Sequence, residues 1–209
     1  MGVLLLLLLV TGASAQSLQK ASPEQSKKMV EAANKATAAV KTIQCDFTQV
    51  RQSAMVKEKM TSKGKMYFSG TNLKWAYTSP NQYALIVKDG GQQVYIQQDG
   101  KTKKAEGQSA QLFKGIAQIV MGSVTGAALS ENGDFAVEMF TQGGKWVAKL
   151  TPKQPKMKKM FTAIYLYFNE SHNAVSKVEM QEANGDTTTI TFTNLRLNEK
   201  VADAVFEVR

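Results

Sequence analysis

The segment from Lys63 to Pro80, KGKMYFSGTNLKWAYTSP, constrains the fold of this chain most strongly. Apolar and polar residues alternate on both sides of a Gly-Thr-Asn turn, so Met66 and Phe68 lie on one face of the first strand. Leu73 and Trp75 likewise share one face of the second strand. The pattern predicts a β-hairpin with one apolar face, and either more protein or a ligand must cover that face.

The same period of two recurs along most of the chain and predicts an antiparallel sheet. Asp89-Gly90 and Asp99-Gly100 separate apolar runs, and such dipeptides are strong hairpin signals. No βαβ order repeats, so the predicted class is mostly β (α+β), with about ten or eleven strands and two or three helices. The predicted strands cover residues 43–48, 60–68, 73–78, 82–88, 92–98, 134–141, 145–151, 160–169, 174–181 and 187–195.

Two segments with a helical period interrupt the strands. Ser22-Pro23-Glu24-Gln25 combines a capping box with proline at the first helical position, which predicts a helix from Pro23 to about Thr42. Residues 109–121 predict a second helix, which could either cover the sheet permanently or open as a lid. Its apolar face holds Leu112, Phe113 and Ile116. Residues 151–159, which hold two prolines and four lysines, predict an exposed loop.

The first fifteen residues have the pattern of a secretory signal peptide. An apolar run, VLLLLLLV, precedes a small-residue cleavage site that ends at Ala15, and the run is too short to span a bilayer. We therefore predict export, with residues 16–209 as a single domain. The one cysteine, Cys45, lies in an alternating strand, where a small buried hydrophobic residue is expected.

The formal net charge of +9 predicts anionic or neutral partners. Export argues against nucleic acid, which leaves acidic protein surfaces or anionic lipid head groups. Four lysines of the predicted loop could dock on such a partner, or could simply keep the protein in solution. They are Lys153, Lys156, Lys158 and Lys159.

The sequence offers little for catalysis or for a cofactor. His172 is the only histidine, and a metal site built on histidine normally needs two or three such ligands. Neither a G-x-S-x-G elbow nor a glycine-rich phosphate loop is present. We expect no enzyme activity, no metal and no cofactor. Glu131 and Asp134 lie in glycine-rich connections and are most simply turn residues, and hydrolysis of a glycan or ester by paired carboxylates is the remaining alternative.

The alternating strands leave open whether their apolar faces form a packed core or a ligand cavity. A wide, incomplete barrel of antiparallel strands can enclose more space than its side chains fill. The ten methionines and nine phenylalanines would suit ligands of variable shape. The pattern alone favours a packed core.

Motifs in a fixed order along the chain make it resemble the periplasmic outer-membrane lipoprotein carriers of the LolA family. They are Phe47-Thr48-Gln49, Gly64-x-Met66-Tyr67-Phe68, Leu73-Lys74-Trp75-x-Tyr77 with Pro80, Asp89-Gly90 before Val94-Tyr95, Leu112-Phe113, Leu150-Thr151-Pro152, Gly185 before Ile190-Thr191-Phe192-x-Asn194, and Phe206. The resemblance implies an incomplete antiparallel barrel closed by a lid of helices. It also implies a soluble periplasmic monomer that binds acyl chains of lipoproteins.

On this resemblance, the partners are acylated lipoproteins, an inner-membrane lipoprotein-releasing transporter and an outer-membrane acceptor. A sensor of lipid or lipoprotein with the same fold is the alternative, and a secreted hydrolase is a remote one. Family members commonly carry an arginine in the turn where this chain has Ser69-Gly70-Thr71-Asn72, so we expect apolar contacts to hold the lid. The expected acyl-binding residues are Phe47, Met66, Phe68, Leu73, Trp75, Leu85, Val94, Leu112, Phe113, Ile116, Phe135 and Met139.

Overall fold

The computed structural model describes residues 17–56, 58–106, 122, 129 and 133–208 of the chain. The described strands form one antiparallel sheet, with the order β1-β8-β9-β10-β11-β12-β2-β3-β4-β5-β6-β7. Their bounds are β1 Gln19–Lys20, β2 Thr42–Gln52, β3 Lys59–Ser69, β4 Asn72–Ser79, β5 Tyr83–Lys88, β6 Gln93–Gln98, β7 Lys101–Lys104, β8 Phe135–Gln142, β9 Lys145–Pro152, β10 Phe161–Phe168, β11 Val175–Glu182 and β12 Thr187–Leu197.

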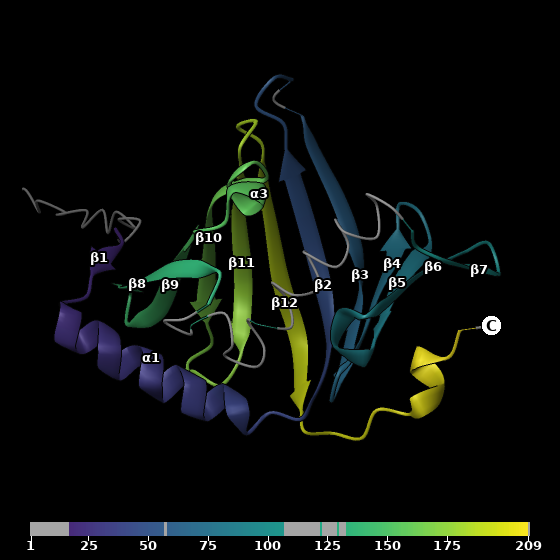
Figure 1. The fold of residues 1–209 in the computed structure, drawn as a ribbon, viewed down its shortest axis with the longest axis horizontal. Coiled ribbons are helices and arrows are strands. Elements are labelled where there is room, and N and C mark those ends of the chain that lie inside the picture. Colours follow the sequence, from purple (N-terminus) through teal and green to yellow (C-terminus); the bar gives the residue numbers. More distant parts are fainter. Residues whose placement is uncertain (1–16, 57, 107–121, 123–128, 130–132, 209) are drawn as a thin grey trace, which may run out of the picture.

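The sheet is open, because β1 and β7 lie at its two edges and do not pair with each other. β12 pairs with β2 along most of its length, from Thr187 opposite Gln52 to Leu197 opposite Ile43. This pairing joins the first half of the chain, β2 to β7, to the second half, β8 to β12. The sheet curves so that the two halves face each other across a concave side (Figure 1).

Helix α1, Pro23–Ala38, begins at the predicted capping box. Ser22 accepts a hydrogen bond from the Gln25 backbone N–H, and the Gln25 side chain accepts one from the Ser22 N–H. Met29, Ala33 and Thr37 form its buried face, and the helix lies across one end of the sheet (Figure 1). It ends before the predicted Thr42, because that residue already belongs to β2.

Shorter turns of helix follow the strands. η1, Asp89–Gly91, links β5 to β6, and the one-turn helix α3, Pro155–Lys158, lies within the segment that the sequence predicted to be an exposed loop. η3, Asp203–Phe206, packs against β4 and buries Phe206. Proline at the start of α3 satisfies the first helical position, which explains how a lysine-rich loop forms a helical turn.

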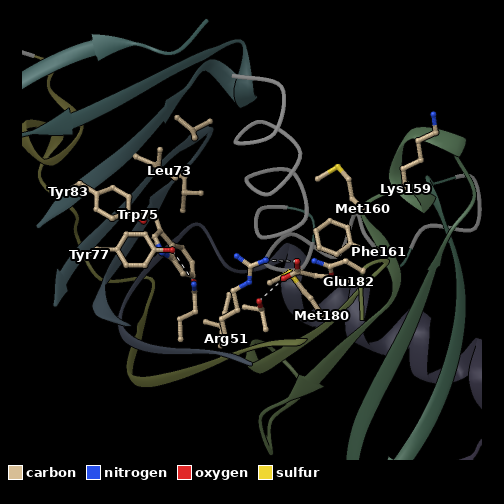
Figure 2. Close-up of a pocket in the computed structure, with 16 residues that line it drawn as sticks. Arg51, Leu73, Trp75, Tyr77, Tyr83, Lys159, Met160, Phe161, Met180 and Glu182 are labelled. Carbon is tan, nitrogen blue, oxygen red and sulfur yellow. Dashed lines mark hydrogen bonds and ion pairs between the residues drawn. The ribbon is translucent and has the colours of Figure 1, made fainter. Parts of the chain in front are cut away.

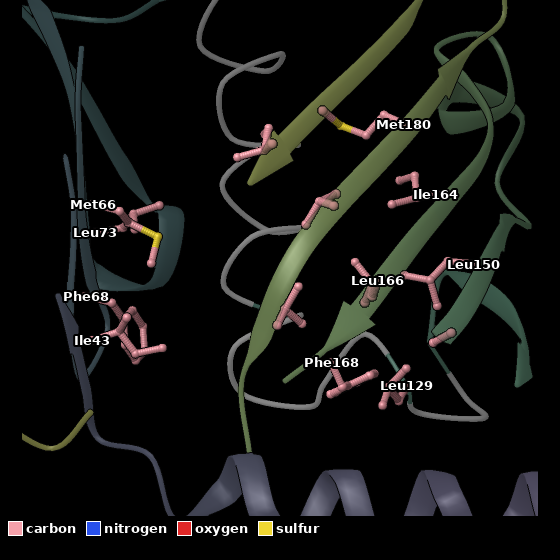
Figure 3. Close-up of a cluster of buried hydrophobic side chains, with 14 of the residues drawn as sticks. Ile43, Met66, Phe68, Leu73, Leu129, Leu150, Ile164, Leu166, Phe168 and Met180 are labelled. Carbon is pink, nitrogen blue, oxygen red and sulfur yellow. The ribbon is translucent and has the colours of Figure 1, made fainter. Parts of the chain in front are cut away.

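The hydrophobic core lies on the concave side of the sheet. Figure 3 shows Met66, Phe68 and Leu73 from one half of the chain facing Ile164, Leu166 and Met180 from the other. Phe47, Phe68, Leu150, Ile164, Leu166 and Phe168 are nearly inaccessible to solvent. Cys45 belongs to this core, as predicted, and its burial raises the pKa of the thiol to about 12.

The predicted class, an incomplete antiparallel barrel, is confirmed, and each of the ten predicted strands is present. The structure adds β1 and β7, which carry no apolar alternation and form by pairing with β8 and β6. The predicted helix at residues 109–121, with its role as a lid, lies outside the described residues. No helix in the described ranges is long and apolar enough to cross a membrane.

Candidate functional site

A cavity of about 450 Å³ opens on the concave side between the two halves of the sheet. Figure 2 shows side chains of β4 and β5 on one side, those of β10 and β11 on the other, and Arg51 of β2 between them. The cavity is lined by Gln49, Arg51, Leu73, Trp75, Tyr77, Tyr83, Leu85, Val87, Lys159, Met160, Phe161, Met180, Glu182, Asn184, Thr188 and Ile190.

The first wall of the cavity comes from the hairpin β4–β5. Leu73 pairs with Val87 and Trp75 pairs with Leu85, so these four side chains project from the same face of the two strands. Alternation in both strands sends Lys74 and Ile86 to the opposite face. The hairpin that the sequence singled out therefore contributes an apolar wall to the cavity.

Aromatic rings extend this wall toward β2. Trp75 stacks on Phe47, with ring centroids 4.2 Å apart, and Tyr77 stacks on Tyr83 at 4.4 Å. The Tyr77 hydroxyl donates a hydrogen bond to Gln49 Oε1 at 2.9 Å. Burial raises the pKa of Tyr77, so its hydroxyl stays protonated at neutral pH and remains a donor. Phe47 lies beneath this layer and supports Trp75 from behind.

The second wall comes from the C-terminal half of the chain. Met160 directly precedes β10 and Phe161 begins it, Met180 lies near the end of β11, and Ile190 lies within β12. Met180 and Ile190 occupy neighbouring strands, where Met180 pairs with Thr188 and Val178 pairs with Ile190. This wall is also apolar, and its two methionines can adjust to the shape of a ligand.

Charged groups gather at one end of the cavity. Arg51 Nη2 donates to Glu182 Oε2 and to Asp186 Oδ2, both at 3.0 Å, and the Thr188 hydroxyl donates to Glu182 Oε1 at 3.0 Å. Asp186 also accepts a hydrogen bond from the Ala54 N–H at 3.0 Å. That bond, followed by the charge of Arg51, lowers the pKa of the Asp186 carboxyl, so the carboxyl is ionised at neutral pH.

This charged end is also the end that reaches solvent. Lys159 and Asn184 line the cavity and are exposed, and the Arg51 side chain is 47% exposed. The Lys159 side chain makes no ion pair or hydrogen bond within the part of the chain that the structure describes. The cavity thus has apolar walls and one polar, solvent-exposed rim.

The structure brings three of the predicted acyl-binding residues to the cavity: Leu73, Trp75 and Leu85. Six others lie deeper in the core and do not line it, although they belong to the same buried layer. They are Phe47, Met66, Phe68, Val94, Phe135 and Met139. Leu112, Phe113 and Ile116 lie outside the described residues. Of the four predicted docking lysines, which are all exposed, Lys159 lines the cavity.

Sequence reasoning missed most of the second wall and the charged rim. The alternating signal in residues 160–168 and 187–195 was available, but nothing in it indicated which strands of the two halves face each other. Arg51, Glu182 and Asp186 come together only through the pairing of β2 with β12. In the described ranges, no three potential metal ligands come together.

Comparison with known proteins finds a family match over most of the chain. The profile of the family described as "Outer membrane lipoprotein carrier protein LolA" matches residues 38–209. The chain belongs to the LolA family. A curated relative from Cupriavidus taiwanensis, an "outer-membrane lipoprotein carrier protein", is 30% identical over 172 residues, which cover 80% of this chain and 77% of the relative.

Solved structures resemble this LolA-family chain only distantly. A DUF1329 family protein from Desulfovibrio piger is 11% identical, with a TM-score of 0.48 over 87% of this chain and 97% of that one. A LolA superfamily protein from Nitrosomonas europaea is 13% identical, with a TM-score of 0.46 over 87% and 97% of the two chains. We draw no functional conclusion from likenesses at this level.

Proposed function

We propose that this protein is a periplasmic carrier, which holds the acyl chains of lipoproteins in its concave cavity and carries them from the inner to the outer membrane. The cavity between the two halves of the sheet is the observation that carries the proposal. Membership of the LolA family and the name of the Cupriavidus relative support it. Export by the predicted signal peptide, which lies outside the described residues, belongs to the same proposal.

The chemistry of the cavity walls suits a hydrocarbon chain. Leu73, Leu85 and Val87 face Phe161 and Met180, and none of these side chains needs a hydrogen-bond partner. The volume of about 450 Å³ lies within the range of roughly 300–1,000 Å³ that is usual for small-molecule sites. Each methylene group moved from water into such a site contributes about 0.8 kcal/mol.

The polar rim sets the orientation of the cargo. Burying the ester and amide groups of a lipoprotein anchor without partners would cost free energy. The solvent-exposed end, with Arg51, Lys159 and Asn184, is the place where those groups can keep their hydrogen bonds. We therefore place the acyl chains between the apolar walls and the peptide portion outside the rim.

Transfer by such a carrier requires reversible binding and no covalent chemistry. We infer that the protein is not an enzyme and that it acts as a monomer, because a single chain supplies both walls of the cavity. An inner-membrane transporter would load it, and an acceptor at the outer membrane would remove the cargo by binding it more tightly. The driving force for handover to the acceptor is the difference between two affinities, so this protein needs no cofactor for that step.

A release assay tests the proposal. The purified protein is mixed with inner-membrane vesicles that contain a labelled lipoprotein and the releasing transporter, and the label is then followed into the supernatant. We expect the label to leave the membrane as a one-to-one complex with the protein. If the label stays with the membrane while the protein still binds free lipid, the lipid-sensing alternative replaces the carrier.

A further inference from the structure

Large apolar side chains are strongly exposed at one place in the described part of the chain, the tip of the β2–β3 hairpin. Met55 is 91% exposed, Val56 is 64% exposed and Met60 is 69% exposed. Single exposed hydrophobic residues are common, but three at the end of one hairpin form a patch that water solvates poorly. We call these three residues the apolar tip.

The apolar tip lies at the open end of the cavity. Met60 pairs with Arg51 in the β2–β3 register, so both side chains project from the same face, and Arg51 lines the cavity. The Ala54 N–H, next to Met55, donates to Asp186, which binds Arg51. Hydrogen bonds therefore fix the base of the tip to the polar rim.

Basic side chains accompany the apolar tip. Lys59 is exposed beside Met60, and Lys158 and Lys159 are exposed at the end of α3. The Met160 carbonyl accepts a hydrogen bond from Ala183 at 3.0 Å, which holds the end of α3 against the β11–β12 turn. Figure 1 shows α3, the β11–β12 turn and the β2–β3 tip at the same end of the molecule.

Among the residues described at this end, four basic ones, Arg51, Lys59, Lys158 and Lys159, outnumber the acidic ones by one. Glu182 and Asp186 are both bound by Arg51, and Glu58 is the exposed carboxylate at the tip. In the described ranges, the ammonium groups of Lys158 and Lys159 have no ion-pair partner. Exposed apolar side chains at the same end of the molecule as unpaired lysines suit a lipid surface, in which hydrocarbon lies beneath negatively charged head groups.

We propose that the apolar tip inserts into the surface of an anionic lipid bilayer, with Lys59, Lys158 and Lys159 against the head groups. A stable protein interface buries about 1,200 Å² or more, which a narrow hairpin tip does not provide, whereas a membrane accepts a small apolar wedge beside basic residues. Docking in this way points the open end of the cavity at the bilayer. Membrane docking itself does not depend on the proposed carrier function. Only its use, to bring the cavity to a membrane for loading or delivery, rests on that function.

Vesicle flotation tests docking without any lipoprotein. The purified protein is mixed at low salt with vesicles of phosphatidylglycerol and phosphatidylethanolamine, or with vesicles of phosphatidylcholine alone. We expect at least tenfold tighter binding to the anionic vesicles. The triple variant M55S/V56S/M60S should lose tenfold or more of this binding, because the apolar side chains no longer insert.

A pair of matched variants separates local charge from net charge. K59Q/K158Q and K101Q/K103Q remove the same charge, but Lys101 and Lys103 are exposed on the edge strand β7. The first variant should bind anionic vesicles at least fivefold more weakly, and the second should stay within twofold of the wild type. Equal losses in both variants would overturn the proposal, as would wild-type protein that does not float.

Two further measurements complete the test. Analytical ultracentrifugation of the wild type and the triple variant shows whether the apolar tip is instead a contact between two copies of the chain. A wild-type dimer that is lost in the triple variant and that binds no vesicles would overturn membrane docking. Binding of a fluorescent fatty acid is followed in the same samples. Loss of vesicle binding with unchanged fatty-acid binding locates the defect in docking, whereas absent fatty-acid binding in the wild type contradicts the carrier function alone.

Discussion

Gly64 of β3 is the position where one methyl group should disturb both the core and the cavity wall. Gly64 pairs with Phe47 of β2, whose ring covers it. A Cβ atom at this position would lie 2.1 Å from the Ala76 carbonyl oxygen and 2.4 Å from Phe47 Cζ. Real contacts of a Cβ atom are more than 1 Å longer, so β3 and β4 must separate or the ring must move.

The size of the effect follows from these contacts. Replacing glycine by alanine normally stabilises a protein by about 0.4–1 kcal/mol where the backbone permits it. Overpacking a core costs roughly 1–3 kcal/mol, and here one of the clashing atoms belongs to the backbone, which cannot rotate away. We therefore expect Gly64→Ala to lower the free energy of unfolding by about 2 kcal/mol, as measured by urea denaturation.

The displaced ring should also be detectable at the cavity. Phe47 stacks on Trp75, so Gly64→Ala should change the Trp75 fluorescence in a Trp146→Phe background, which leaves Trp75 as the single tryptophan. In a Phe47→Leu background the same substitution should cost about 1 kcal/mol less, because part of the clash is gone. A Gly64→Ala protein within about 0.5 kcal/mol of the wild type would refute this description of the wall.

Three further predictions address the cavity, its rim and the thiol. Leu85→Gln should weaken binding of a fluorescent fatty acid by tenfold or more because it places an amide in the apolar wall, whereas Thr191→Gln on an exposed position of β12 should change it less than twofold. Asp186→Asn should destabilise the protein at pH 7. Because the pKa of Asp186 in the folded protein is lowered from 3.8, the difference in the free energy of unfolding between the variant and the wild type should shrink as the pH falls below about 4. Acid titrations of unfolding measure this difference. Cys45 should resist a thiol reagent at pH 8 until urea unfolds the protein, because its pKa is about 12; rapid reaction of the folded protein would contradict its burial.

The strands and their apolar faces could be predicted from the sequence because both depend on local alternation. Leu73 and Trp75 line the cavity, and Met66 and Phe68 lie on the buried face. Alternation predicts the face of the sheet on which a residue lies. It does not predict whether that residue lines the cavity or is covered by another side chain. Phe47 shows the limit, because its own strand cannot reveal that Trp75 of β4 lies over it.

The second wall could not be predicted because it depends on contacts between distant strands. Met180 and Ile190 reach the cavity after β12 has paired with β2, which brings the two ends of the chain together. The ion pairs of Arg51 with Glu182 and Asp186 require the same pairing, and one residue of slippage would break them. The short strand β7, with sequence KTKK, is likewise defined by its neighbour and not by its own residues.

The central claim is that the cavity carries lipoprotein acyl chains, and the most direct measurement is the identity of the molecule bound in the native envelope. The protein is purified from its own envelope fraction without detergent, and the bound species are identified by native mass spectrometry. The carrier function predicts acylated lipoproteins in one-to-one complexes, and their loss in the Leu85→Gln variant. Protein that is consistently empty, or that holds only free lipid, would contradict it.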